Sequence, residues 1–415
     1  MAAGIETDCL VIGAGPAGLA AARGLVDAGV RSVLIVDRDE APGGLPQYCR
    51  HLGFGWGYTH RLETGPTFAR RMIAALDQAR VRILPRSSAL AIRPGPIVDL
   101  VGPECGVVSV SARAVIVATG IRERPRGARL IPGRRPERGV LTTGQLQQMV
   151  TRGVKLPGRR MVVVGTEHVA YSVLLTARHA GHKVVAMIEL GDRPSSYAVL
   201  AAVTRHVARI PIHLSARIVD ILGDRQVEAV EIDGPAGRRA IACDSVVFSG
   251  DFVPDAALAR ASGIAIDPRT HGPQIDQFGR TSMHGVFAAG NVLRAVETSG
   301  FAAIEGARVG AAAAVFLRDP TQWRVQPRTI RVSPEFAYLV PQCWSAGSDT
   351  LTPVPFSLRV NKDLGASRVA MKIGDTVVWQ GIAKTLRRHR RIRLSPAVLS
   401  THATADAPLT VCATR

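Results

Sequence analysis

Residues 8–37 read DCLVIGAGPAGLAAARGLVDAGVRSVLIVD, and this stretch decides the fold of the first part of the chain. A short apolar run is followed at once by the pattern Gly13-x-Gly15-x-x-Gly18, and then by apolar residues at helical spacing. A second apolar run ends in Asp37. The order of strand, glycine turn, helix, strand and acid predicts a parallel βαβ unit that binds a dinucleotide.

Each residue of this pattern has a physical task in that interpretation. Gly13 allows the tight turn, Gly15 lets backbone N–H groups approach a pyrophosphate, and Gly18 lets the helix lie close to the strand. The helix N-terminus supplies partial positive charge for the phosphates, and Asp37 can accept hydrogen bonds from ribose hydroxyls. The alternative is a parallel-sheet unit whose glycines serve only packing.

The composition is that of a soluble globular protein. The chain has 415 residues, of which 47% are hydrophobic and 20% charged, and this length leaves room for two or three domains. No apolar run is long enough to cross a bilayer, and the N-terminus has no basic leader. We therefore expect a cytoplasmic protein without a membrane span.

The net charge of +19 raises the question of nucleic-acid binding. The basic residues are spread through the chain, and the densest run, Arg387-Arg388-His389-Arg390-Arg391, has no aromatic residues interleaved for base stacking. We interpret this run as a solvated loop between strands and expect no nucleic acid as a partner. The charge is compatible with an anionic cofactor or an acidic partner protein.

The cysteines stand alone in the sequence. No CxxC, CxxxxC or Cys/His spacing typical of a metal site occurs among Cys9, Cys49, Cys105, Cys243, Cys343 and Cys412. This pattern predicts no bound metal and no redox dithiol built from a local motif. A disulfide framework is not expected in a cytoplasmic chain of this size.

The stretch at 160–188 repeats the opening unit in degraded form. A strand, Gly165, a helix, Gly181 and a second strand occur in order, but Glu167 stands where the second glycine is expected. A carboxylate there would face the pyrophosphate and repel it. Glu189, at the end of the second strand, could still contact a ribose. The sequence leaves open whether this unit binds NAD(P) or has lost its nucleotide.

Two further stretches have the form of flavin-binding segments. Residues 114–120, AVIVATG, read as a buried strand that ends in small residues and lets the backbone approach a dinucleotide. Residues 285–291, GVFAAGN, precede a small-residue helix near Gly300. Asn291 stands where an aspartate usually binds the ribitol of FAD, and it can still hydrogen-bond a hydroxyl. The N-terminus of the following helix would favour a reduced, anionic flavin.

The order of these four stretches resembles the two-dinucleotide-binding-domain flavoproteins of the pyridine nucleotide–disulfide oxidoreductase superfamily. The resemblance covers residues 6 to about 320. Stretches such as GGLPQYCRHLGFGW and GDFVPDAAL are similar to one branch, the FAD-dependent oxidoreductases that resemble subunits of glycerol-3-phosphate, sarcosine and amino-acid dehydrogenases.

The resemblance implies an α/β fold with two Rossmann-like dinucleotide-binding domains, glutathione-reductase-like in their arrangement. An FAD-binding domain would be built from residues 1–125 and 245–320, with an NAD(P)-binding-like domain, residues 126–244, inserted between its halves. Residues 325–415 lie outside the resemblance. Their alternating runs and the turn signal Gly374-Asp375 predict a small β-rich C-terminal domain, used for docking or oligomerisation.

FAD is the cofactor that the resemblance implies. The residues expected to bind it belong to the motifs above or are their neighbours: Gly13, Gly15, Pro16, Ala17, Gly18, Asp37, Arg38, Gly43, Gly44, Gln47, Ala89, Ala118, Thr119, Gly120, Gly290, Asn291, Ser299 and Gly300.

The leading hypothesis for the function is an FAD-dependent oxidoreductase, an electron-transferring or dehydrogenase subunit that acts on a small metabolite. The CxxxxC of the disulfide reductases and the His-x-x-x-x-Glu pair of the glutathione-reductase type are absent. Expected partners are the small-molecule substrate, a partner dehydrogenase or electron-carrier subunit, and further copies of the chain. Two alternatives stay open: an NAD(P)H-dependent flavin reductase with a thiol beside the flavin, and a non-catalytic flavin-bound scaffold subunit.

Cys49 is the one candidate catalytic residue. It follows Gly43-Gly44, at a position similar to that of the redox thiol in relatives. Arg50 and His51 are adjacent and could lower its pKa, which would give a thiolate able to donate into the flavin. The alternative is a small packing residue in a cofactor loop.

Overall fold

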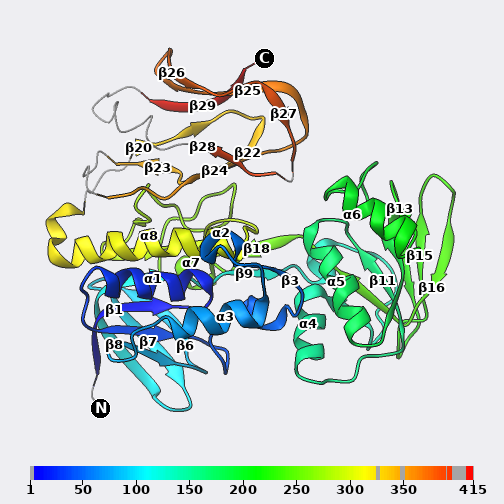
Figure 1. Cartoon of the computed structure of the whole chain (residues 1–415), viewed down its shortest axis with the longest axis horizontal. Coiled ribbons are helices and arrows are strands. Elements are labelled where there is room, and N and C mark those ends of the chain that lie inside the picture. Colours follow the sequence, from blue (N-terminus) through cyan, green and yellow to red (C-terminus); the bar gives the residue numbers. More distant parts are fainter. Residues whose placement is uncertain (1–3, 324–327, 346–350, 389, 395–407, 415) are drawn as a thin grey trace.

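The computed structural model describes residues 4–323, 328–345, 351–388, 390–394 and 408–414. The chain forms three parts, which Figure 1 shows at the lower left, at the right and at the top. The first two are built on sheets of mainly parallel strands, and the third is mainly antiparallel. Within the basic run of the third part, His389 lies outside the described residues.

The first part is built on a seven-stranded sheet. Its strands are β1 (Ile5–Ile12), β2 (Val33–Val36), β5 (Val81–Leu84), β6 (Ser88–Arg93), β7 (Ile97–Gly102), β8 (Gly106–Val117) and β19 (Val286–Ala288). Their order is β5-β2-β1-β8-β7-β6, and β19 pairs with β8. The strands β1, β2, β5, β8 and β19 run parallel, and the ends of β1 and β8 therefore meet at one edge. All residues of β2 and β19 are buried, as expected for parallel strands covered on both faces.

Two helices of this part pack against each other along the sheet (Figure 1). The helix α1 (Pro16–Asp27) follows β1 through the glycine turn, and α8 (Ser299–Arg318) follows β19. A Cβ atom added to Gly306 of α8 would lie 2.0 Å from the carbonyl oxygen of Ala17. The two backbones therefore touch, and a side chain at residue 306 would separate them.

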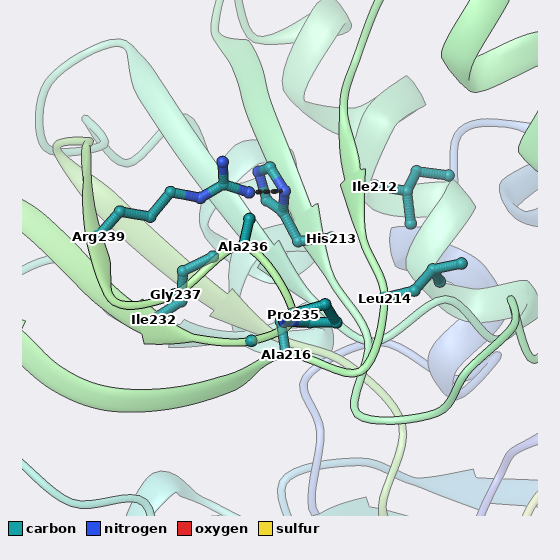
Figure 2. Close-up of a pocket in the computed structure, with 10 residues that line it drawn as sticks. Ile212, His213, Leu214, Ala216, Ile232, Pro235, Ala236, Gly237 and Arg239 are labelled. Atoms are coloured by element: carbon teal, nitrogen blue, oxygen red, sulfur yellow. Dashed lines mark hydrogen bonds between the residues drawn. The ribbon is translucent and has the colours of Figure 1, made fainter.

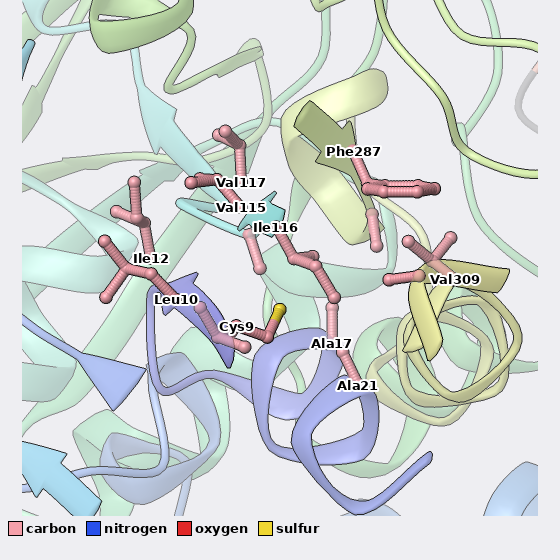
Figure 3. Close-up of a cluster of buried hydrophobic side chains, with 14 of the residues drawn as sticks. Cys9, Leu10, Ile12, Ala17, Ala21, Val115, Ile116, Val117, Phe287 and Val309 are labelled. Carbon is pink, nitrogen blue, oxygen red and sulfur yellow. The ribbon is translucent and has the colours of Figure 1, made fainter. Parts of the chain in front are cut away.

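The contact between α1 and α8 belongs to the main hydrophobic core. Figure 3 shows Ala17 and Ala21 of α1 gathered with Ile116 of β8 and Val309 of α8. Among the described residues, α8 is the one helix long and apolar enough to span a bilayer, yet 72% of its apolar window is buried. Its apolar composition follows from its position in this core.

Short elements fill the rest of the first part. They are η1 (Leu45–Tyr48), β3 (Leu52–Phe54), α2 (Trp56–Thr59), β4 (Glu63–Thr64), α3 (Gly65–Ala74), α7 (Ala257–Ala261) and η4 (Gly290–Leu293). The strands β3 and β4 form a hairpin that carries α2 between them. This hairpin and η1 lie in the glycine-rich segment that follows Asp37.

The second part is built on a five-stranded parallel sheet and a three-stranded antiparallel sheet. The parallel sheet has the order β10-β17-β11-β12-β13, and the antiparallel sheet has the order β14-β15-β16. The elements are β10 (Val140–Thr142), α4 (Thr143–Thr151), β11 (Arg160–Val164), α5 (His168–His179), β12 (Lys183–Ile188), α6 (Ala198–Ala202), η3 (Val203–Val207), β13 (Ile212–His213), β14 (Arg217–Leu222), β15 (Ala229–Asp233), β16 (Arg239–Ala242) and β17 (Ser245–Phe248).

The strand β17 corrects one expected boundary. Sequence analysis places it in the FAD-binding domain, which was predicted to resume at residue 245, but β17 pairs in parallel with β11 and β10 of the second part. All of its residues are buried, and a short buried run has no sequence feature that tells which parallel sheet it joins. The chain returns to the first part through β18 (Phe252–Pro254), which pairs with β9 (Ile121–Glu123). The other domain boundaries stay a prediction.

The third part is β-rich, as the sequence predicts. Its strands are β20 (Arg328–Thr329), β21 (Arg331–Val332), β22 (Phe336–Val340), β23 (Cys343–Trp344), β24 (Phe356–Val360), β25 (Leu364–Ile373), β26 (Thr376–Gln380), β27 (Lys384–Leu386), β28 (Ile392–Leu394) and β29 (Leu409–Thr414). Ile373 pairs with Thr376 across Gly374-Asp375, which confirms the expected hairpin. Most of the buried apolar side chains of this part, Phe336 and Phe356 among them, form a second core, while Tyr338, Val340 and Val354 join the main core of the first part.

The α1–α8 contact gives a first prediction. We expect Gly306→Ala to lower the free energy of unfolding by about 1–3 kcal/mol, because overpacking at a backbone contact outweighs the helical preference of alanine. Gly127→Ala is the matched control, since a Cβ atom there meets nothing within 4 Å. Thermal denaturation of both variants measures the difference. Equal midpoints would contradict the close contact.

Candidate functional site

The glycine turn between β1 and α1 is shaped by backbone contacts on two sides. Gly13 has φ +108°, and a Cβ atom there would lie 2.4 Å from the carbonyl oxygen of Ala118 at the end of β8. A Cβ atom on Gly18 would lie 1.9 Å from the carbonyl oxygen of Gly13. These two glycines are therefore required by the fold itself, whether or not a nucleotide is bound.

Gly15 differs from its neighbours in the same turn. Its φ is −77°, and a Cβ atom there would have only the Cα of Gly44, at 4.0 Å, as a neighbour. Gly15 caps α1 and Pro16 opens the helix, while no side chain satisfies the cap. The first N–H groups of α1 are thus left without helical partners, beside a residue with no side chain, which suits a pyrophosphate.

The acid at the end of β2 faces this turn. Asp37 Oδ2 accepts a hydrogen bond from the N–H of Ala14 at 2.5 Å, and Oδ1 accepts one from the N–H of Asp39 at 2.8 Å. Burial raises the pKa of Asp37, and the two backbone amides oppose that shift. The carboxylate keeps lone pairs for ribose hydroxyls.

The loop after Asp37 returns to the glycine turn. The N–H of Gly43 donates to the carbonyl of Ala14 at 2.8 Å, and Gly44, with φ +62°, approaches the Cα of Gly15 so closely that a Cβ atom would lie 2.8 Å from it. Gln47 donates through Nε2 to the carbonyl of Ala41 at 3.2 Å. The structure therefore brings Gly43 and Gly44 beside the turn, as the sequence predicts.

Three other predicted positions also lie near this edge of the sheet. The N–H of Ser87 donates to the carbonyl of Asp37 at 2.8 Å, which places the segment of Ala89 beside the acid. Arg38 forms an exposed ion pair with Asp255 at 3.0 Å. Thr119, after β8, donates its hydroxyl to the carbonyl of Asp255 at 2.7 Å.

The segment before α8 approaches α1. Gly290 has φ +81°, and a Cβ atom there would lie 2.5 Å from the Cβ of Ala17. Asn291 exchanges two hydrogen bonds with the backbone of Glu297, from Nδ2 to the carbonyl at 3.1 Å and to Oδ1 from the N–H at 2.9 Å. The hydroxyl of Thr298 caps α8 by accepting from the N–H of Phe301. One donor and one acceptor position of the Asn291 amide remain for a ribitol hydroxyl.

Cys49 is not the activated thiol that its neighbours in sequence indicate. Its Sγ lies 3.4 Å from Oε1 of Gln147 on α4, and burial raises the pKa of the thiol to about 12, with Glu123 adding to the shift. The Arg50 guanidinium lies 3.3 Å from His179 at the end of α5 instead of beside the sulfur. The thiol is therefore protonated at neutral pH, and this finding corrects the expectation of a thiolate.

The remaining thiols give no redox pair either. All six cysteines are free. No group of three or more His, Cys, Asp or Glu side chains suited to a metal occurs in the part of the chain that the structure describes.

In the second nucleotide-like unit, the carboxyl group of Glu167 occupies the space beside the glycine turn. A Cβ atom on Gly165 would lie 2.6 Å from Oε2 of Glu167, and one on Gly250 would lie 3.1 Å from the same carboxyl group. Ser249 donates its hydroxyl to Glu167 Oε1. Burial raises the pKa of Glu167, Glu189 raises it further, and Ser249 lowers it. The carboxyl group thus lies between the two glycine turns, where a pyrophosphate would need to pass.

Glu189, the acid predicted to contact a ribose in this unit, is also hydrogen-bonded within the protein. Glu189 Oε2 accepts from the hydroxyls of Thr166 and Ser195, and Oε1 accepts from the N–H of Gly191 at 3.0 Å. The ring of Tyr197 lies 4.6 Å from that of His168, the first residue of α5, and the guanidinium of Arg390, from the third part, lies 4.9 Å from the Tyr197 ring. The carboxyl groups of Glu167 and Glu189 are thus both hydrogen-bonded within the protein, whereas the turn at Gly15 is open.

A separate pocket lies in the second part, between β13 and the turn that joins β15 to β16. Figure 2 shows its lining, in which Arg239 lies beside His213, with 2.6 Å between Nη2 and Nδ1. Burial lowers the pKa of His213, and the charge of Arg239 lowers it further. None of the residues predicted for FAD lines this pocket.

Sequence reasoning missed the residues that hold the segment before α8. Glu305 accepts from the N–H of Gly290 at 2.8 Å and pairs with Arg294, and both side chains are fully buried. Glu297, which orients Asn291, is paired with Arg391 at 3.0 Å. A charged pair in an otherwise small and apolar stretch was the one available signal.

Comparisons with known proteins agree with this geometry. A family model described as pyridine nucleotide-disulphide oxidoreductase matches residues 7–312. An opine oxidase subunit of Agrobacterium tumefaciens (strain Ach5) is 27% identical over 319 residues, which are 68% of this chain and 61% of that protein. The alpha subunit of the sarcosine oxidase of Rhizobium meliloti (strain 1021) is 28% identical over 268 residues, 61% of this chain and 25% of that protein. The chain thus matches only part of the length of each relative.

Solved structures show the same fold. Thioredoxin reductase of T. acidophilum superposes with a TM-score of 0.61 at 22% identity, over 76% of this chain and 99% of that one. L-proline dehydrogenase from P. horikoshii superposes with a TM-score of 0.56 at 18% identity, over 78% of this chain and 57% of that one. The predicted α/β fold is confirmed.

The open space at Gly15 gives a second prediction. We expect Gly15→Ala to fold as the parent protein does but to bind FAD at least about tenfold more weakly, because the methyl group enters the place of the pyrophosphate. Gly127→Ala is again the matched control. Titration of the apoprotein with FAD, together with thermal denaturation without FAD, separates the two effects. Unchanged FAD affinity would contradict the assignment of the turn.

Proposed function

Because the chain belongs to the pyridine nucleotide-disulphide oxidoreductase family and is an FAD-dependent oxidoreductase, we propose that it is an electron-transferring or dehydrogenase subunit for a small metabolite. The observation that supports the proposal is the position of the Glu167 carboxyl group, against the glycine turns at Gly165 and Gly250. In this proposal, that carboxyl group excludes the pyrophosphate of a nicotinamide nucleotide. Without that nucleotide and without a dithiol, electrons must enter from a substrate and leave to another acceptor.

The residues of the first part divide the work of holding FAD. The turn at Gly15 and the N-terminus of α1 bind the pyrophosphate, and Asp37 binds the ribose. Asn291 orients the ribitol, and the first turn of α8, at Ser299 and Gly300, supplies partial positive charge to the ring. When bound, FAD accepts and donates electron pairs, and the protein supplies orientation and electrostatics.

A partner protein completes the proposal. The relatives are named as subunits, and the hairpin β3–β4 exposes Trp56, Leu52 and Leu62 at 68%, 61% and 60%. This hairpin reaches the flavin end of α8, where a Cβ atom on Gly300 would lie 3.5 Å from the backbone of Gly57. An apolar face on a chain of net charge +19 fits a partner with an acidic rim.

The cytoplasmic location expected from the sequence is part of the same proposal. An NAD(P)H-dependent flavin reductase is the alternative that Glu167 disfavours. A non-catalytic flavin-bound scaffold is the outcome if no partner confers turnover.

The position of Glu167 in the second nucleotide-like unit gives a third prediction. Anaerobic mixing with NADH or NADPH should bleach the flavin slowly or not at all. Glu167→Gly should speed bleaching about tenfold, which corresponds to about 1.4 kcal/mol of steric and charge repulsion removed. Ser249→Ala is the matched control, because it removes the hydrogen bond to Glu167 but keeps the carboxyl group. Rapid bleaching of the parent protein at micromolar nucleotide would overturn the proposal.

The exposed hairpin gives a fourth prediction. A partner co-purified from the native host should confer dye-linked dehydrogenase activity and should dissociate in high salt. Trp56→Ala should weaken its binding about tenfold or more, as expected for a central aromatic anchor. Leu130→Ala, at a leucine that is 88% exposed outside the hairpin, should leave binding unchanged. Equal binding by both variants would contradict the assignment of the surface.

A further inference from the structure

A buried charge cluster joins the third part of the chain to the start of α8. It contains the carboxylates Glu297 and Glu305 and the guanidinium groups of Arg294, Arg359 and Arg391. Arg294 and Glu305 are fully buried, and Glu297 is 8% exposed. Such a cluster, inside a core, is costly unless every charge is paired, so its geometry is tightly fixed.

The third part supplies most of the partners of Glu297. Arg391 lies 3.0 Å from Glu297 Oε2 and Arg359 lies 3.4 Å from Oε1. The hydroxyl of Ser357 donates to Oε1 at 3.0 Å. Arg359 also donates to the carbonyl of Val296 at 2.9 Å, which fixes the backbone next to Glu297.

The backbone of Glu297 in turn fixes the amide of Asn291. Its N–H donates to Oδ1 at 2.9 Å and its carbonyl accepts from Nδ2 at 3.1 Å. These two bonds decide which way the amide points, because they distinguish its oxygen from its nitrogen. A path of direct contacts therefore runs from Arg391 through Glu297 to Asn291.

The same arginine also touches the first turn of α8. Its guanidinium lies 3.5 Å from the ring centroid of Phe301, the third residue of the helix. Each of the three guanidinium groups of the cluster has a carboxylate partner, but there are only two carboxylates, so the cluster has a net charge of +1 beside this helix N-terminus. That charge and the helix dipole act in the same direction on an anion placed there.

We propose that Arg391 and Arg359 are positioning residues for FAD, which orient Asn291 through Glu297 and so make FAD affinity depend on the C-terminal β part. The inference rests on the proposed function, since it takes Asn291 as a ligand of the ribitol. It gives this part a role besides the expected docking or oligomerisation. It also corrects the expectation of a wholly solvated basic run, because Arg391 faces inward.

The test is a double-mutant cycle on FAD binding by the full-length apoprotein. Arg391→Met removes the charge and keeps the apolar stem, and Asn291→Ala removes the proposed ligand. Each should raise the FAD dissociation constant about tenfold, and the double variant should bind no more weakly than Asn291→Ala alone, because both changes act on one contact. Arg391→Lys should recover part of the loss.

The matched control is Arg393→Met. Arg393 is exposed on β28, two residues after Arg391, so this variant loses the same charge without touching Glu297. It should bind FAD as the parent does. A loss of FAD affinity equal to that of Arg391→Met would show that the loss follows from the change in net charge and not from the contact with Glu297.

The outcomes separate the two proposals. Additive losses in the cycle would overturn the path through Glu297 and would leave the proposed function intact. A parent apoprotein that cannot bind FAD would overturn the proposed function first. If Arg391→Met does not fold, Ser357→Ala removes one donor to Glu297 and takes its place in the same cycle. Unchanged FAD affinity in Ser357→Ala and Arg391→Lys together would contradict the inference.

Discussion

The backbone contact between α1 and α8 is the constraint on which the FAD site depends. Gly306 and Gly310 of α8 lie against the carbonyls of Ala17 and Ala21, so the two helices approach as closely as backbones allow. That approach carries Gly290, just before α8, onto Ala17 in the first turn of α1. In the proposed site, the N-termini of α1 and α8, from distant parts of the chain, would therefore serve one anionic ligand.

In the second nucleotide-like unit, the glycine turn is in contact with an acidic side chain of its own chain, Glu167. Glu167 would be unfavourable as a buried, unpaired carboxylate. The hydroxyl of Ser249 and the charge of Arg129 act against the rise of its pKa that burial causes. Arg129 also donates to the carbonyls of Ser249 and Gly250, so the turn that would face a nucleotide is closed by protein groups.

Local patterns were enough to predict the first βαβ unit and the Gly374-Asp375 hairpin, because turn, strand and helix signals there lie within a few residues. Membership of a sheet is not local, and β17 was misplaced for that reason. Adjacency in sequence also misled at Cys49, where Arg50 points to α5 and burial raises the thiol pKa. The predicted FAD residues around Gly15 and Asp37 do meet, since parallel strands bring their ends to one edge.

The charge cluster at Glu297 lies beyond any interpretation of the sequence, because Arg391 and Glu297 are 94 residues apart and belong to different parts of the chain. An apolar contact could have joined these parts with less desolvation. A carboxylate with three directed donors does what an apolar contact cannot, since it fixes the backbone at Glu297 in one orientation. The amide of Asn291 needs that orientation to offer its free donor and acceptor to a hydroxyl. The buried hydrogen bonds to Glu297 from the third part thus set the orientation of the backbone that holds Asn291.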